Sequence, residues 1–392
     1  MRKLPNIVLI VCDTLGAKHM SLYGYHRKTT PMLERLVEEE GFIVYKNCFA
    51  TAPWTIPSHA SLFTGLYPIN HGTFGADVED YFLDKNLFTL PEVLKSSGYK
   101  TIGISNNYLI GHYFGFSKGF DEFIEMDRPF LFKDELIVPE RKKFDKLKFV
   151  VEKLLSKGYT KKAAAKLINA LYRRAFGTVN INSYPYTVKT LKLFSKRVKT
   201  LQNSVSPFFL FVNLMETHDL YKPPLDFQGR FVKCEKAFIN KQPTWMNYYT
   251  TGFSEATIDK LTGLYDEEVL TLDYILGCMY AELKKSAILD NTLFIITSDH
   301  GEALGEKKHF GHMFSMYNET LHIPLIVRFP EGWVNDKGEN CDLVQLHDIY
   351  ATILENIDCC MPAPSDSVSL LSSTKREYAV SFAKKTEIHS KL

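Results

Sequence analysis

The stretch NIVLIVCD, residues 6–13, is a run of β-branched and other apolar residues that ends on an aspartate. Such a run is typical of a strand whose two faces are both buried in a parallel sheet. Similar apolar runs return at 100–105, 207–214, 292–297 and 325–329. These stretches predict the strands of a central sheet.

Helical patterns separate the predicted strands. Thr30 and Pro31 are expected to open a helix that runs to Glu40, because Thr can cap a first turn and Pro is tolerated at the first helical position. Further helices are expected over 88–97, 255–285 and 348–356. This alternation predicts an α/β fold with a mostly parallel central sheet and helices on both faces.

The region from 141 to 199 is strongly basic. It carries 17 Lys and Arg residues against two acids, a charge of +15 that leaves −13 for the rest of a chain whose net charge is +2. Helical stretches at 144–155 and 160–176 interrupt the strand and helix rhythm, so we interpret residues of about 128–205 as a basic helical insertion in a domain spanning 1–358. A short C-terminal remnant or tail, 359–392, follows.

The basic region has two interpretations. It is either a solvated helical face or a site for a polyanion, such as a phosphorylated glycan, an anionic lipid surface or a nucleic acid. Few aromatic residues accompany the charges, so nucleic acid is the least favoured of these partners.

Composition excludes several classes of protein. The 392 residues, 45% hydrophobic and 23% charged, are enough to bury a large core, so disorder is not expected. Seven cysteines without CxxC spacing predict reduced thiols in a cytoplasmic protein. The first apolar run is too short for a signal peptide, and no stretch has the length of an integral membrane segment.

Chemically reactive side chains directly follow two predicted strands. Asp13 ends the first, and Asp299 and His300 follow 292–297. Ligands gather beyond the carboxyl ends of parallel strands, and carboxylates with an imidazole suit one divalent cation, Ca²⁺, Mg²⁺, Mn²⁺ or Zn²⁺. A single strand-end aspartate is more often a helix cap, but the two places together favour a metal site.

A third motif, PWTIPSHASLFTG, covers residues 53–65. One interpretation is a loop leading into a helix capped by Ser58. The functional interpretation puts the Thr55 hydroxyl at a helix N-terminus, where backbone N–H groups and the helix dipole favour an anion. Coordination to a metal would lower the pKa of this hydroxyl and make it a competent nucleophile.

The motifs, in this order, resemble the sulfatase family of the alkaline phosphatase superfamily. The resemblance also covers 216–218, 265–276 and 291–327. It implies an alkaline-phosphatase-like fold. The metal positions that it implies are Asp13, Thr14, Thr55, Asp299 and His300, of which Thr14 stands where many members have a second acidic ligand and Thr55 is also the nucleophile.

Three departures from the family pattern concern the nucleophile and the anion contacts. Sulfatases proper carry, at the position of Thr55, a Cys or Ser that is oxidised to formylglycine, which Thr cannot become. His59 replaces the signature arginine, and Asn106 and Asn107 fall near an expected lysine and histidine; all three are candidate substrate-binding residues. The pattern is similar to the branch with an unmodified Thr nucleophile, which contains phosphonate monoester hydrolases and phosphoglycerol transferases.

Histidines complete the predicted site. His218 matches a substrate-binding histidine of the family, and His312 is near a position that contacts the leaving group, so both are predicted to be catalytic. His309 is a further candidate for substrate binding. Each of the three competes with an ordinary structural histidine.

The expected function is therefore that of a metal-dependent hydrolase or transferase. It acts on phosphate esters or diesters, free or linked to a polymer, through Thr55, with one divalent ion and no formylglycine. The alternatives are an arylsulfatase-like sulfuric ester hydrolase and a catalytically inactive, anion-binding member of the fold.

Overall fold

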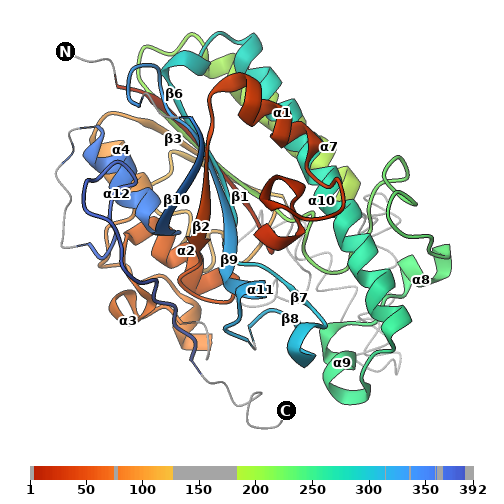
Figure 1. The fold of residues 1–392 in the computed structure, drawn as a ribbon. Coiled ribbons are helices and arrows are strands. Elements are labelled where there is room, and N and C mark those ends of the chain that lie inside the picture. Colours follow the sequence, from red (N-terminus) through yellow and green to blue (C-terminus); the bar gives the residue numbers. More distant parts are fainter. Residues whose placement is uncertain are drawn as a thin grey trace, which may run out of the picture.

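The computed structural model describes residues 4–74, 78–126, 183–313, 315–334, 337–357, 359 and 365–384. The predicted helices at 144–155 and 160–176 lie outside these residues. One sheet of eight strands has the order β10-β2-β9-β6-β1-β5-β3-β4 (Figure 1). Its strands are β1 (Asn6–Cys12), β2 (Ile43–Phe49), β3 (Lys100–Ser105), β4 (Glu122–Glu125), β5 (Phe208–Leu214), β6 (Thr292–Thr297), β9 (His322–Arg328) and β10 (Gly338–Gln345).

All pairings in this sheet are parallel except those of β9, which runs antiparallel to β2 and β6. The carboxyl ends of β1, β5 and β6 therefore meet at one edge. The mostly parallel sheet of the sequence-based prediction is confirmed, and a small β7–β8 hairpin (Ala303–Leu304, Phe310–Gly311) lies outside it.

Helices cover both faces of the sheet (Figure 1). One face carries α1 (Pro31–Glu40), α7 (Ser183–Leu201) and α10 (Glu255–Lys285), and the other carries α2 (Thr55–Thr64), α4 (Leu90–Ser96) and α12 (Asp348–Glu355). Side chains of β1 alternate between two cores: Val8 and Ile10 enter the first, and Ile7 and Leu9 the second. Both faces of β1 are thus buried, as its uninterrupted apolar run predicts.

The remaining helices are short and lie in the connections. They are α3 (Pro68–His71), α8 (Lys236–Asn240), α9 (Trp245–Thr251) and α11 (Asn318–Leu321). Within the described part of the chain, no helix is both long and apolar enough to cross a membrane.

Three strands, β2, β4 and β10, were not among the predicted ones. β4 and β10 are the edge strands of the sheet, and their residues are largely half-buried. An edge strand has a neighbour on one side only, so its sequence need not show a continuous apolar run. β2 lies inside the sheet but carries Lys46 and Asn47 in its second half, which breaks the pattern.

The helix α1 begins at Pro31 as predicted, but its first turn is capped differently. Thr30 makes no side-chain cap, because its hydroxyl accepts a hydrogen bond from Leu22 N instead. The carboxylate of Asp273, on α10, accepts from Met32 N and Leu33 N, at 2.8 Å each. The cap thus comes from a distant helix.

Helix α7 falls within the predicted basic insertion of about 128–205. Its Phe194 and Val198 are nevertheless buried in the core shared with α10, so α7 is a layer of the main fold. The predicted C-terminal tail is also packed: residues 365–384 run past α2 and α12, where Phe382 N donates to Thr51 O at 2.8 Å.

Candidate metal and nucleophile site

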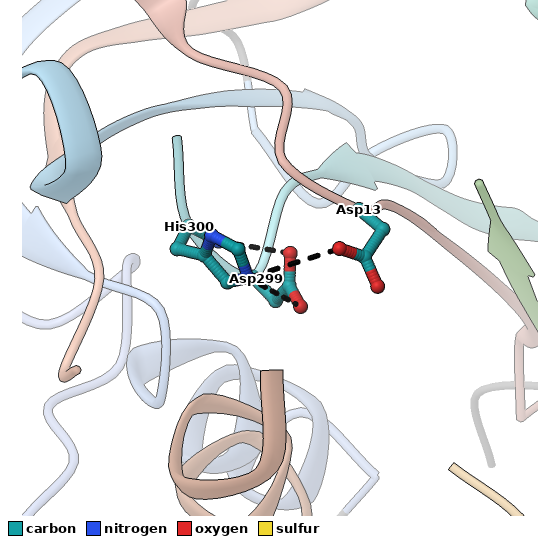
Figure 2. A group of neighbouring side chains, drawn as sticks. All are labelled: Asp13, Asp299 and His300. Carbon is teal, nitrogen blue, oxygen red and sulfur yellow. Dashed lines mark hydrogen bonds and ion pairs between the residues drawn. The ribbon is translucent and has the colours of Figure 1, made fainter. Parts of the chain in front are cut away.

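Asp13, Asp299 and His300 converge at the carboxyl edge of the sheet (Figure 2). β1 and β6 are hydrogen-bonded neighbours, so the residues that follow them emerge side by side. His300 Nε2 lies 3.7 Å from Asp13 Oδ1 and 3.5 Å from Asp299 Oδ2. One donor atom from each residue lies within 4.8 Å of the other two, which is close enough to bind a single ion.

The free electron pairs of this group fit a cation. Asp13 Oδ1 and Asp299 Oδ2 are completely buried and have no hydrogen-bond partner among the described residues. His300 Nδ1 donates to Gly301 O at 2.9 Å, which leaves a lone pair on Nε2. Two buried carboxylate oxygens without a donor are costly unless a positive charge joins them.

The pKa directions agree with this reading. Burial and the neighbouring charge of Asp13 raise the pKa of Asp299 well above its usual value. Burial, together with the nearby imidazole of His312, lowers the pKa of His300 well below that of a free histidine. A neutral imidazole is the form that binds metals, and a bound cation would return Asp299 to its ionised form.

Hydrogen bonds fix the two loops that carry the ligands. Ser298 Oγ lies 2.6 Å from Cys12 O and accepts from Leu15 N at 3.1 Å, so it joins the loop after β6 to the loop after β1. Thr217 Oγ1 donates to Asp13 O at 2.6 Å. The position of the predicted metal ligands thus depends on the ends of β1, β5 and β6 together.

Thr55 is the first residue of α2, so the interpretation in which the helix starts at Ser58 is wrong. Trp54 has extended backbone angles, and Ser58 Oγ donates to Ala52 O at 2.9 Å instead of capping the helix. The Thr55 hydroxyl is 2% exposed and its Oγ1 lies 3.3 Å from His300 Nε2. The structure therefore brings Thr55 to the predicted metal ligands.

His59 lies one turn after Thr55 and is fully buried. Its Nδ1 donates to Thr55 O at 3.0 Å and lies 3.4 Å from Asp299 Oδ2. Asn213 Nδ2 lies 3.4 Å from His59 Nε2, as a donor to it. Burial lowers the pKa of His59 to about 4, so a neutral imidazole occupies the position of the family's arginine.

The two asparagines and Thr14 make contacts within the protein. Asn107 Nδ2 donates to Asp13 Oδ2 at 2.7 Å, so Asn107 supports a predicted metal ligand. Asn106 Oδ1 accepts from Thr190 Oγ1 at 2.9 Å. The Thr14 hydroxyl donates to Asp13 O at 2.7 Å, and its backbone N–H points to Asp299 Oδ1 at 3.3 Å.

His218 and His312 lie next to the predicted metal ligands. The ring centroid of His312 lies 4.6 Å from that of His300 and 5.1 Å from that of His218. His312 Nδ1 lies 3.1 Å from Glu302 Oε1, and His218 Nδ1 lies 2.9 Å from Asp219 Oδ1.

The pKa of His218 reflects opposing effects. Burial alone would lower it, but the hydrogen bond and charge of Asp219, with the charge of Asp13, hold the pKa of His218 well above its usual value. A protonated His218 can act as an acid or as an anion contact.

His309 lies apart from this group of rings, at the β7–β8 hairpin. Its Nδ1 is 3.4 Å from the Tyr249 hydroxyl, and its ring centroid is 5.4 Å from that of Tyr317. None of its contacts with described residues involves a predicted metal ligand.

Sequence reasoning missed several supporting residues. They are Asn213, Thr217, Tyr265, Ser298 and Glu302. Asn213 had a visible signal, since it is a fully buried amide in the otherwise apolar strand β5. The others lie within or beside the motifs, but their partners are set by the fold.

Comparison with known proteins gives one family. The model described as Sulfatase matches residues 5–358. Arylsulfatase K of Canis lupus familiaris is 25% identical over 394 residues, which cover 94% of this chain and 66% of that protein. N-acetylglucosamine-6-O-sulfatase of Bacteroides thetaiotaomicron is 26% identical over 364 residues, covering 84% and 64%. The chain thus spans slightly less than two thirds of these curated relatives.

Solved structures share the fold. The phosphonate monoester hydrolase of Agrobacterium radiobacter is 18% identical with a TM-score of 0.65, covering 94% of this chain and 76% of that one. A 2-O GAG sulfatase is also 18% identical, with a TM-score of 0.67 and coverage of 98% and 78%. At this identity the likeness concerns the fold, and it agrees with the alkaline-phosphatase-like architecture expected from the sequence.

Proposed function

This chain belongs to the sulfatase family, and from that premise we propose that it is a metal-dependent hydrolase or transferase of phosphate esters or diesters that uses Thr55 as its nucleophile. The observation that carries the proposal is the 3.3 Å contact between Thr55 Oγ1 and His300 Nε2, at the start of a helix. An unmodified threonine hydroxyl cannot supply the aldehyde chemistry of formylglycine. It can attack phosphorus directly.

Asp13, Asp299 and His300 would hold the cation. A divalent ion bound there would supply positive charge that stabilises the substrate's anionic oxygens and the deprotonated Thr55 hydroxyl, whose proton would pass to water. The helix N-terminus at Thr55 directs further backbone N–H groups toward the same anion.

The chain's own side chains account for the rest of the reaction. Thr55 Oγ forms a bond to phosphorus as the bond from phosphorus to the leaving oxygen breaks, and the electron pair goes with that oxygen. His218 or His312 donates a proton to it. Water or an alcohol acceptor then attacks phosphorus and breaks the bond to Thr55 Oγ, which regains a proton.

The substitution Thr55→Ala tests this function. We expect turnover of bis-nitrophenyl phosphate to fall by at least about 10³-fold, because the nucleophile is removed, while Mn²⁺ binding persists. Thr55→Ser should retain measurable turnover. Thr64→Ala, at the other end of α2, is the matched control, because the Thr64 hydroxyl donates only to Ala60 O, at 2.7 Å. Unchanged turnover in Thr55→Ala contradicts the proposal.

A second candidate is the hydrolysis of sulfate esters by the same hydroxyl. It is favoured by the relatives, among them arylsulfatases and amino-sugar 6-O-sulfatases. Parallel assays with nitrophenyl sulfate and bis-nitrophenyl phosphate separate the two. No turnover of either, with metal bound, would instead favour an inactive, anion-binding member of the fold.

A polyanion partner of the basic region is a separate proposal. Lys189, Lys192, Lys196 and Lys199 of α7 are exposed at helical spacing. Lys199 lies 3.9 Å from Glu282, and the other three form no ion pair with another described residue. Binding to heparin or anionic vesicles that weakens steeply with salt would support it. The cytoplasmic location and the domain limits expected from the sequence stay predictions.

A further inference from the structure

We infer that one buried polar face of helix α10 positions the metal-ligand loop after β1, and that the Tyr265 hydroxyl sets the metal affinity through the backbone on either side of Leu15. The inference rests on the metal binding proposed above. It assigns a role to side chains that do not touch the ion.

Tyr265 is hydrogen-bonded to the backbone of the loop just after the ligand Asp13. The tyrosine is completely buried, and its hydroxyl donates to Thr14 O at 2.7 Å. The same hydroxyl accepts from Gly16 N at 3.0 Å. Both hydrogen-bonding functions of the phenol are therefore used on a three-residue stretch of backbone.

That stretch needs external support. Thr14 has φ of 60°, in the left-handed region that β-branched residues rarely occupy. Such a conformation persists where surrounding contacts determine it. The hydrogen bond from Tyr265 to the Thr14 carbonyl is one contact, and the one from Thr14 N to Asp299 Oδ1, at 3.3 Å, is another.

The same helix holds the remainder of the connection to α1. Asp266 is fully buried and accepts from Tyr25 OH at 2.8 Å and Arg27 Nη1 at 2.6 Å, and it lies 2.8 Å from His19 Nδ1. Asp273, two turns later, caps α1. Hydrogen bonds from three side chains of α10, those of Tyr265, Asp266 and Asp273, thus hold residues 14–33.

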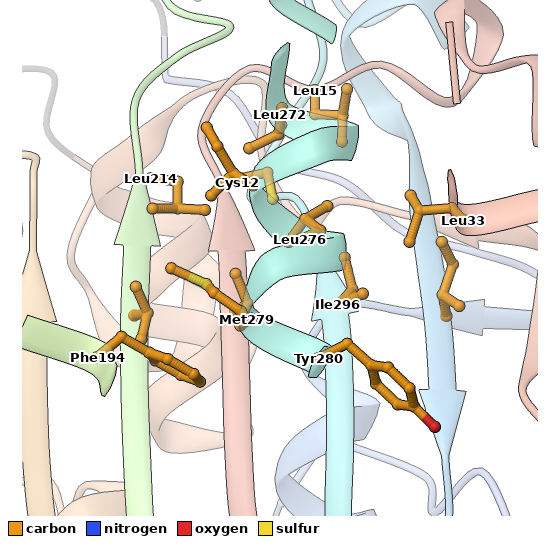
Figure 3. Packing of buried hydrophobic residues seen from close by; sticks show 14 of the residues in the cluster. Cys12, Leu15, Leu33, Phe194, Leu214, Leu272, Leu276, Met279, Tyr280 and Ile296 are labelled. Carbon is orange, nitrogen blue, oxygen red and sulfur yellow. The ribbon is translucent and has the colours of Figure 1, made fainter. Parts of the chain in front are cut away.

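Apolar packing supports the same arrangement. Figure 3 shows Leu272 and Leu276 of α10 beside Cys12 and Leu15, which flank the ligand Asp13, and all four belong to one buried cluster. The polar contacts therefore act on a loop whose apolar side chains are already packed in the core. Tyr265→Phe should keep that packing and remove only the hydroxyl.

The consequence concerns metal affinity. Asp13 and Asp299 are buried close together and repel each other when both are ionised, so the loop must hold Asp13 at binding distance for the cation to enter. Removing the Tyr265 hydroxyl leaves the carbonyl of Thr14 and the N–H of Gly16 without their partner. The loop then samples positions in which Asp13 is displaced, and the site binds the ion less tightly.

The experiment compares two tyrosines of α10 in the full chain. Calorimetry with Mn²⁺ should give a dissociation constant about 10-fold higher for Tyr265→Phe. Tyr280→Phe, the matched control, removes a buried hydroxyl that donates to Glu40 Oε2 at 2.8 Å, far along the helix, and should leave Mn²⁺ affinity unchanged. The Co²⁺ absorption spectrum should change in Tyr265→Phe alone, which a loss of general stability would not produce.

Other outcomes separate this inference from the proposed function. If Asp13→Asn abolishes Mn²⁺ binding while Tyr265→Phe binds like the wild type, the inference is overturned and the metal site stands. If the wild type itself does not bind Mn²⁺, both fail. Should Tyr265→Phe not fold, Asp266→Asn serves in its place: weaker Mn²⁺ binding supports positioning by α10, and unchanged binding overturns it.

Discussion

Two of the places at which the protein buries carboxylates differ in the partners that they offer. At the carboxyl edge of the sheet, Asp13 Oδ1 and Asp299 Oδ2 meet no donor from the described residues. At the start of α12, Asp348 is 1% exposed and is bound by Arg376 through two nitrogens. Gln345 N and Val368 N each add a hydrogen bond of 2.8 Å to Asp348.

The difference distinguishes a candidate ligand site from a structural ion pair. Where the chain supplies its own cation, the ion pair fixes residues 365–384 against the fold, and Arg376 also contacts Tyr67 OH at 3.0 Å and Asp366 O at 2.9 Å. Where the described residues supply none, burial and the neighbouring carboxylate disfavour the ionised form, and a cation from outside would stabilise it. Four experiments test this difference.

The largest effect is expected from Asp299→Asn. Loss of one ligand charge should abolish Mn²⁺ binding and lower kcat/KM for a phosphodiester by at least about 10³-fold. The metal-free protein should not lose stability, because burial and the charge of Asp13 already disfavour the ionised form of Asp299. Kinetics and thermal unfolding in chelator check this. Activity within tenfold of the wild type would show that the carboxylate is not a metal ligand.

Arg376→Met should have the opposite effect to Asp299→Asn, since it should lower stability and leave metal binding unchanged. Leaving Asp348 buried without its cation is expected to lower the free energy of unfolding by about 3–5 kcal/mol, while the folded protein binds Mn²⁺ as before. Urea denaturation in chelator measures the loss. The neighbouring Lys375→Met is the control: its pair with Asp342, at 2.9 Å, is largely exposed and should contribute less than about 1 kcal/mol. Equal losses of stability in the two variants would show that the buried Arg376–Asp348 pair has no special structural role.

Metal addition should stabilise only a chain with an intact ligand site. At a free Mn²⁺ concentration of 100 times the dissociation constant, the free energy of unfolding should rise by about 2.7 kcal/mol. Arg376→Met should gain the same increment and Asp299→Asn none. Unfolding curves with and without the ion give the comparison, and an increment in Asp299→Asn would contradict it.

The smallest effect concerns pH. Asp219 helps to hold the pKa of His218 above its usual value, so the protonated form persists to higher pH. In Asp219→Asn that support is lost, the pKa falls, and the alkaline limb of kcat should move to lower pH. NMR titration of the His218 ring checks the pKa independently of turnover. An unmoved limb with a lowered pKa would exclude His218 as the acid.

Much of the fold could be predicted because it follows from the local pattern of apolar residues. The apolar runs of β1, β3, β5 and β6 and the long helix at 255–285 lie where the sequence places them. The antiparallel direction of β9, whose strand was expected at 325–329, and the buried face of α7 could not be predicted. Direction and layer are set by which neighbours a segment meets, not by its own residues.

The same distinction between local features and contacts set by the fold applies to the predicted site. Asp13, Asp299, His300 and Thr55 could be named because strand ends and a helix start are local features. Asn107 was expected to bind substrate, and its amide donates to Asp13 Oδ2; its role in substrate binding stays a prediction. The sequence could not decide between these roles, since both use the same amide at the same strand end.

The family, the mostly parallel sheet and the order in which reactive residues follow its strands can be inferred from the residues alone. The three-dimensional fold settles which charges are left without a partner, the contact of Tyr265 with Thr14 and the pairing of Arg376 with Asp348. Burial and pairing arise between segments that are separate in the sequence, by 251 residues for Tyr265 and Thr14 and by 28 for Arg376 and Asp348. The energy of a buried charge depends on those surroundings far more than on the residue that carries it.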